Sequence, residues 1–206
     1  MSVGVPIAQH EALYAAYVDE MTASVRGFQL RRKRDSRFCR LIDTVLKVLT
    51  FGGQDRFMTE YITTFGGRIY VPAGWDDTPP GERYCILRHE IIHVRQFRRL
   101  TWPGITLVYV LFPLPVGLAA GRAWLEWEGY RETLKSTWQV YGEAEARSVR
   151  LKKSIVRRFT GPDYGWMWLR GRTISNAIDR YLETLAADPP PALPPPALSL
   201  ARTISP

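Results

Sequence analysis

The sequence predicts a mainly helical α+β domain that contains one small β-hairpin. Apolar residues recur at helical intervals along most of the chain. One stretch, "RFMTEYITTFGGRIYVPAGW" (residues 56–75), is instead rich in β-branched and aromatic residues around Gly66-Gly67, which is typical of two strands and a tight turn. With 206 residues, of which 46% are hydrophobic, the chain can bury a substantial core, and we expect one domain over residues 1–187.

The domain is expected to have a helical N-terminal part (1–50), a central part (51–135) and a helical C-terminal part (136–187). The apolar spacing and the turn residues predict five helical segments. They cover about residues 9–27, 38–49, 78–100, 122–158 with an interruption at Gly142, and 170–186. The hairpin lies between the second and the third of these segments.

The most apolar part of the chain, residues 104–121, carries no charged side chain. It is at the short limit for a membrane-spanning helix and is interrupted by Pro113 and Pro115. We therefore favour a buried core segment or a helical hairpin, with shallow membrane insertion as the alternative. The chain starts without the basic and apolar regions of a signal peptide and has two cysteines, so we expect a cytoplasmic protein, with a membrane-peripheral location as the alternative.

The net charge of +8 predicts either a solvated basic surface or attraction to an anionic partner, such as a membrane surface or a nucleic acid. The basic residues are concentrated in residues 31–37, 95–99 and 147–158. None of these clusters has interleaved aromatic residues, as a stacking surface for single-stranded nucleic acid would. Residues 188–206 are rich in proline, and we expect a mobile tail that could bind another protein.

Residues 89–93 read HEIIH, an HExxH motif within the helix predicted for residues 78–100. Histidines at i and i+4 lie on one helix face roughly 6 Å apart, so His89 and His93 can bind one tetrahedral ion. Glu90 then lies beside the ion, where its carboxylate can take a proton from water as a general base. We predict a zinc site at these residues; the alternative is two partly buried histidines on an ordinary helix.

A zinc site of this kind needs a third protein ligand. Arg99 stands where HExxHxxGxxH would place another histidine, so an acidic residue is expected instead. In "AWLEWEGYRETLK" (residues 123–135), Glu128 and Glu132 share a helix face with basic residues, as on a solvated surface. Glu126 shares its face with Gly129, a small residue that lets another helix approach closely. We predict Glu126 as the third ligand. The alternatives are Glu128, Glu132 and Glu145.

With a glutamate on a later helix, His89-Glu90-x-x-His93 resembles the zincin-like metallopeptidases of the gluzincin type. The resemblance covers about residues 62–130. It implies a zincin-like domain in which Zn²⁺ is held by the two histidines and Glu126, and Glu90 acts as base and then as proton donor. Many gluzincins carry an aspartate shortly after the third ligand, where this chain has Tyr130. A tyrosine hydroxyl could orient an imidazole or stabilise an oxyanion, so we predict Tyr130 as the catalytic helper.

The resemblance also implies a strand that binds the substrate backbone. In zincins an edge strand before the metal helix pairs with the substrate, and Ile69, Tyr70 and Val71 are the residues expected here. The alternative is a strand that only packs against the helix. The predicted function is therefore zinc-dependent hydrolysis of peptide bonds in a polypeptide. The competing hypothesis is a catalytically inactive zincin fold that serves as a structural or interaction module.

Other residues with reactive or aromatic side chains are expected to have structural roles. Cys85 precedes His89 by one helical turn, but a small buried hydrophobic residue is the favoured interpretation. For Tyr164, Trp166 and Trp168, aromatic core packing is favoured over the wall of a substrate cleft. His10 lies on a polar helix far from the motif.

Overall fold

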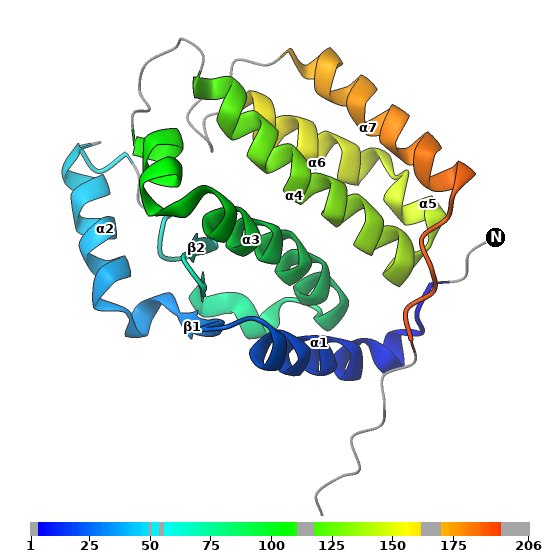
Figure 1. Ribbon diagram of the computed structural model, residues 1–206, viewed down its shortest axis with the longest axis horizontal. Coiled ribbons are helices and arrows are strands. Elements are labelled where there is room, and N and C mark those ends of the chain that lie inside the picture. Colours follow the sequence, from blue (N-terminus) through cyan, green and yellow to red (C-terminus); the bar gives the residue numbers. More distant parts are fainter. Residues whose placement is uncertain (1–3, 50, 54–55, 111–117, 162–169, 195–206) are drawn as a thin grey trace, which may run out of the picture.

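The computed structural model describes residues 4–49, 51–53, 56–110, 118–161 and 170–194 (Figure 1). Its elements, with η marking a 3₁₀ helix, are η1 (Ile7–Gln9), α1 (His10–Ser24), β1 (Gln29–Arg32), η2 (Lys33–Asp35), α2 (Arg37–Leu49), β2 (Thr63–Phe65), β3 (Arg68–Val71), η3 (Ala73–Asp77), α3 (Pro80–Val110), α4 (Leu118–Tyr141), α5 (Glu143–Ala146), α6 (Val149–Thr160) and α7 (Gly171–Ala187). Helices predominate over one small sheet, so the predicted α+β, mainly helical fold class is confirmed.

The sheet has three strands in the order β1-β3-β2. The predicted hairpin is β2 and β3, which pair antiparallel across a turn in which Gly66 has φ +62°. The strand β1, which was not expected from the sequence, pairs parallel with β3 on its other side. Because both edges of β3 are hydrogen-bonded, the prediction that Ile69, Tyr70 and Val71 form a substrate-binding edge strand is wrong. All three side chains are buried in the protein core.

Two hydrophobic clusters lie on either side of the interface between α3 and α4 (Figure 1). The first joins α1, the sheet and α3, and the second joins α4 with α6 and α7. Central members of the first cluster are Leu13, Met21, Ile69, Val71, Leu87, Ile91 and Val94. Central members of the second are Leu134, Trp138, Ile155, Phe159, Ile178 and Leu182. Each fully buried aliphatic or aromatic side chain contributes about 1.5–3 kcal/mol to folding. Each of the two helices is therefore anchored by its own cluster on the side that faces away from the α3–α4 interface.

Helices α3 and α4 run antiparallel and hold the site between them. Arg88 near the start of α3 bonds Gln139 near the end of α4, whereas Gln96 further along α3 bonds the Leu125 carbonyl near the start of α4. The apolar segment 104–121 supplies the end of α3 and the start of α4, and residues 111–117 lie outside the described part of the chain. Among the helices that the structure describes, none is both long and apolar enough to cross a membrane.

The helical region predicted for residues 122–158 is divided into α4, α5 and α6. Gly142 has φ +90°, a conformation that side-chain-bearing residues rarely adopt, and it separates α4 from α5. The Ser148 hydroxyl then accepts a hydrogen bond from the Leu151 amide and caps α6. The interruption expected at Gly142 is therefore confirmed.

The proline-rich segment expected to be a mobile tail begins with residues that lie against the domain. The carbonyl of Pro191 accepts a hydrogen bond of 2.7 Å from the side chain of Gln139. Leu193 packs against the cluster formed by α1 and α3. Residues 195–206 lie outside the described part of the chain, and the expectation for them stays a prediction.

Lys33 is buried, although it belongs to a basic run that would ordinarily form a solvated surface. Its Nζ donates a hydrogen bond of 2.5 Å to the Phe57 carbonyl and lies 3.6 Å from the centroid of the Phe57 ring. Burial lowers the pKa of Lys33 to about 8, even though Cys39 and Glu90 act in the opposite direction. This lysine joins η2 to the chain segment before β2.

We expect the stability difference between the wild type and Lys33→Met to depend on pH. Between pH 8 and 10.5, Lys33 is protonated in the unfolded chain and largely neutral in the folded one. The unfolded state binds the extra proton, so wild-type stability rises relative to the variant across this interval and the difference is constant below it. Urea unfolding of both proteins at pH 7 and pH 10 measures the change. The control variant Ser154→Met, which changes no ionisable group at an exposed position of α6, should show the same difference from the wild type at both pH values.

Candidate metal centre

The two histidines of the HEIIH motif lie on the face of α3 that packs against α4. Their imidazole rings are buried, and the Nε2 atoms of His89 and His93 are 3.1 Å apart. The i, i+4 spacing places both rings on one face, as expected, and the antiparallel neighbour α4 covers them. Two ring nitrogens therefore meet inside the protein.

Glu126 on α4 completes a group of three potential ligands. Its Oε2 atom lies 3.7 Å from Nε2 of His89 and 3.8 Å from Nε2 of His93. This oxygen is buried and accepts no hydrogen bond from any residue that the structure describes. One ligand atom from each residue lies within 4.8 Å of the other two, so this buried group could hold a metal ion.

The other acidic candidates have different partners. Glu128 accepts a hydrogen bond of 2.9 Å from the Gln96 amide, Glu132 pairs with Arg88, and Glu145 pairs with Arg150. Of the four glutamates considered from the sequence, Glu126 is the one that the structure brings to His89 and His93.

Cys85 and His10 lie outside the group of potential ligands. The Cys85 thiol is part of the core cluster, and burial raises its pKa to about 11, as expected for a small buried hydrophobic residue. His10 has its Nε2 atom 2.9 Å from the Val5 carbonyl. Tyr164, Trp166 and Trp168 lie outside the described residues, and the expectation for them stays untested.

Hydrogen bonds at the Nδ1 atoms determine the tautomers of both histidines. The Thr133 hydroxyl donates to the Gly129 carbonyl at 3.3 Å, so it accepts a proton from Nδ1 of His89 at 3.0 Å. The Gln96 amide nitrogen donates to the Leu125 carbonyl at 3.0 Å, so its oxygen accepts from Nδ1 of His93 at 2.9 Å. Each Nε2 atom is left with a free lone pair that faces the Glu126 carboxylate.

Three acceptor atoms that face one another without a donor require a cation between them. Burial lowers the pKa of His89, but the carboxylates of Glu126 and Glu90 outweigh it and raise the pKa overall. Burial likewise raises the pKa of Glu126, but His93 and His89 outweigh it and lower the pKa overall. A proton or a metal ion would satisfy the group, and the two compete for the same lone pairs.

Gly129 allows the imidazole of His89 to lie directly on the backbone of α4. A Cβ atom at this position would be 2.7 Å from Cε1 and 2.8 Å from Nε2 of His89, far inside van der Waals contact. The aromatic ring of Tyr130 lies edge-on to the His89 ring at 4.8 Å between centroids, and it also contacts the Phe159 ring at 5.3 Å. The close helix approach expected at Gly129 is present, and Tyr130 helps to fix the ring of His89.

Glu90, the expected general base, points toward β2. The Thr64 hydroxyl donates a hydrogen bond of 2.5 Å to Oε2 of Glu90, whose side chain is half-buried. The negative charge of Glu90 also contributes to the raised pKa of His89. The roles of Thr64, Gln96 and Thr133 were not expected from the sequence, although Gln96 lies one turn after His93, a spacing that indicates a shared helix face.

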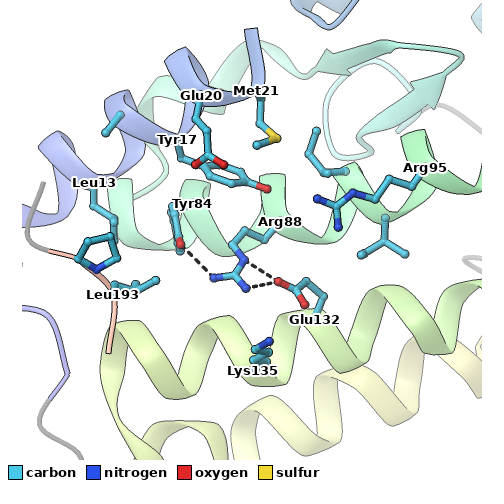
Figure 2. A pocket seen from close by; sticks show the side chains of 14 residues that line it. Leu13, Tyr17, Glu20, Met21, Tyr84, Arg88, Arg95, Glu132, Lys135 and Leu193 are labelled. Atoms are coloured by element: carbon cyan, nitrogen blue, oxygen red, sulfur yellow. Dashed lines mark hydrogen bonds and ion pairs between the residues drawn. The ribbon is translucent and has the colours of Figure 1, made fainter. Parts of the chain in front are cut away.

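A separate cavity of about 600 Å³ lies between α1, α3 and α4 (Figure 2). Within it, the Arg88 guanidinium pairs with Glu132 and donates to the Tyr84 hydroxyl. None of the three potential metal ligands lines this cavity. It is formed by a different face of α3 from the one that carries His89 and His93.

Comparison of the chain with protein-family models, with curated proteins and with solved structures gave no significant match. The interpretation of the site therefore depends on its own geometry.

We expect Gly129→Ala to weaken metal binding by at least about tenfold, because the new methyl group displaces the His89 ring. Gly121→Ala on the same helix is the matched control, since a Cβ there meets no atom within 4 Å. The control should keep its metal affinity and gain up to about 1 kcal/mol of helix stability. Competition with a chromophoric chelator measures the affinity, and equal affinities for the two variants would contradict the assignment.

We also expect Gln96→Leu to lower metal affinity by about 10- to 100-fold, because His93 loses the acceptor that orients its ring. Gln139→Leu is the matched control, since Gln139 is likewise a buried glutamine with hydrogen bonds to Arg88 and the Pro191 carbonyl. The control variant should bind metal as the wild type does. A similar loss in both variants would indicate a general effect on the α3–α4 interface.

Proposed function

We propose that this protein is a zinc-dependent metallopeptidase of the gluzincin type. His89, His93 and Glu126 are the metal ligands, and Glu90 is the general base. The observation that carries the proposal is the convergence, within an HExxH motif and its neighbouring helix, of two Nε2 atoms and a buried carboxylate oxygen that accepts no hydrogen bond from the described residues. Two imidazoles and one carboxylate are the donor set of catalytic zinc sites that leave one position for water or substrate.

The chain's own residues supply the proton transfers. Zinc, when bound, polarises the substrate carbonyl and lowers the pKa of water toward neutrality. Glu90 takes the proton of the attacking water and delivers it to the nitrogen of the leaving amine, so the proton is conserved over the reaction. The Thr64 hydroxyl holds one oxygen of Glu90 in place. Tyr130, whose ring contacts His89, is the proposed donor to the developing oxyanion.

The strand β2 is the proposed binding strand for an extended polypeptide. It pairs with β3 along one edge, and the other edge has no strand partner among the described residues. Thr64 in the middle of β2 contacts the carboxylate of Glu90. A peptide that adds to this edge by backbone hydrogen bonds would therefore run past the general base.

A second candidate function is a structural metal clamp between α3 and α4. It is supported by the burial of the group, because the side chains of His89, His93 and Glu126 are only 9%, 10% and 3% exposed. A clamp of this kind would raise the thermal stability of the protein on metal binding without any turnover. This alternative corresponds to a catalytically inactive zincin fold.

We expect Glu90→Gln to retain zinc and to reduce peptide hydrolysis by at least about 10²-fold, because an amide cannot act as the base. Glu126→Gln should lose most of its zinc affinity because the anionic ligand is removed. Zinc content is measured by elemental analysis, and hydrolysis with an unfolded protein substrate such as casein. Full activity of Glu90→Gln would exclude the proposed mechanism, whereas zinc-dependent stabilisation without activity in the wild type would favour the clamp.

A further inference from the structure

The helix α2 presents an apolar stripe to solvent. Leu41, Val45 and Val48 follow one another at i, i+4 and i+7 and are 63%, 46% and 69% exposed. Phe38, one turn before Leu41, is 38% exposed, and Phe51, just after the helix, is 99% exposed. Five large apolar residues thus lie uncovered along one helix and its end, in a part of the molecule remote from α7 (Figure 1).

A second set of apolar residues on α2 is buried and fixes the helix to the domain. Cys39 is fully buried, and Ile42 and Leu46 pack with it against Phe57 and Tyr70. Positions 39, 42 and 46 are centred about 125° around the helix axis from positions 41, 45 and 48. The core therefore covers one half of the apolar arc and leaves the other half free.

Exposed cations border the apolar stripe. Residues 31–47 contain seven lysines and arginines but only two aspartates. Arg31, Arg37 and Arg40 are exposed, and none of them forms an ion pair with another described residue. An apolar stripe beside unpaired cations is complementary to the interface of an anionic membrane, where apolar side chains enter the acyl boundary and cations meet lipid phosphates and carboxylates.

We infer that the outer face of α2 docks onto the surface of an anionic lipid bilayer. Leu41, Val45, Val48 and Phe51 enter the interfacial region, and Arg37 and Arg40 lie at the level of the lipid headgroups. The helix lies along the membrane surface and does not cross it. The lipid is recognised by its negative charge together with its apolar interior.

The docking face is continuous with the helix that carries the candidate metal ligands. The Phe38 ring lies 4.9 Å from the Phe65 ring, which lies 5.9 Å from the Phe97 ring, with all distances between centroids. Phe97 follows His93 by one helical turn. If the proposed peptidase function holds, a docked molecule has β2 and the metal centre close to the membrane, where they meet polypeptide segments at its surface.

Vesicle flotation of the 206-residue chain tests the docking. We expect the protein to float with vesicles of phosphatidylcholine and phosphatidylserine, and to bind vesicles of phosphatidylcholine alone at least tenfold more weakly. High salt should weaken the binding because it screens the arginines. The double variant Leu41→Asp/Val45→Asp should lose binding by at least about tenfold. Arg37→Ser/Arg40→Ser should lose roughly 30-fold, from about 1 kcal/mol per cation.

Val149→Asp is the matched control, because Val149 is 67% exposed on α6, outside the docking face. It should float as the wild type does, and circular dichroism should show that all variants are folded. The inference is overturned if the wild type binds neither kind of vesicle, or if the α2 variants bind as tightly as the wild type. It is also overturned if the wild type is a dimer and the α2 substitutions make it a monomer without changing its binding to vesicles. Flotation should persist after chelation, so its outcome is independent of the proposed catalysis.

Discussion

At Gly129, α3 and α4 approach so closely that the imidazole of His89 rests on the backbone of the neighbouring helix. This contact sets the register of the antiparallel pair, and the register places Glu126 opposite both histidines. The same register places Thr133 beside His89. Because the two main hydrophobic clusters lie on opposite sides of this interface, neither helix can withdraw without exposing its own core.

The packing of these helices brings together three acceptor atoms that a proton or a metal ion would satisfy, and no other described residue donates a hydrogen bond to the buried oxygen of Glu126. Two imidazole lone pairs and a carboxylate oxygen are removed from water, and the hydrogen bonds to Thr133 and Gln96 turn both lone pairs inward. Facing acceptors in a medium of low dielectric repel one another unless a cation lies between them. The folded chain therefore provides binding energy for a cation at the point where the two helices meet.

Helical periodicity was sufficient to predict the pair His89 and His93 and the inward direction of Glu126, because both depend only on which residues share a helix face. The partners Gln96 and Thr133 depend on the register between two helices, which no local pattern encodes. The middle position of β3 could not be predicted either, since β1 lies within a basic segment and pairs with a strand far along the chain. The burial of Lys33 follows from that same distant pairing. The gluzincin resemblance stays a prediction that rests on the motif.

The helix α2 lies in the connection between β1 and β3, which are neighbours in the sheet and run parallel. Its inner side packs against Phe57 and Tyr70, so α2 cannot swing away from the domain without exposing this cluster. Many amphipathic segments become helical only at a lipid surface and lose conformational entropy at that moment. Here the ordering accompanies the folding of the domain, so α2 offers a preorganised surface whose orientation is fixed relative to α3.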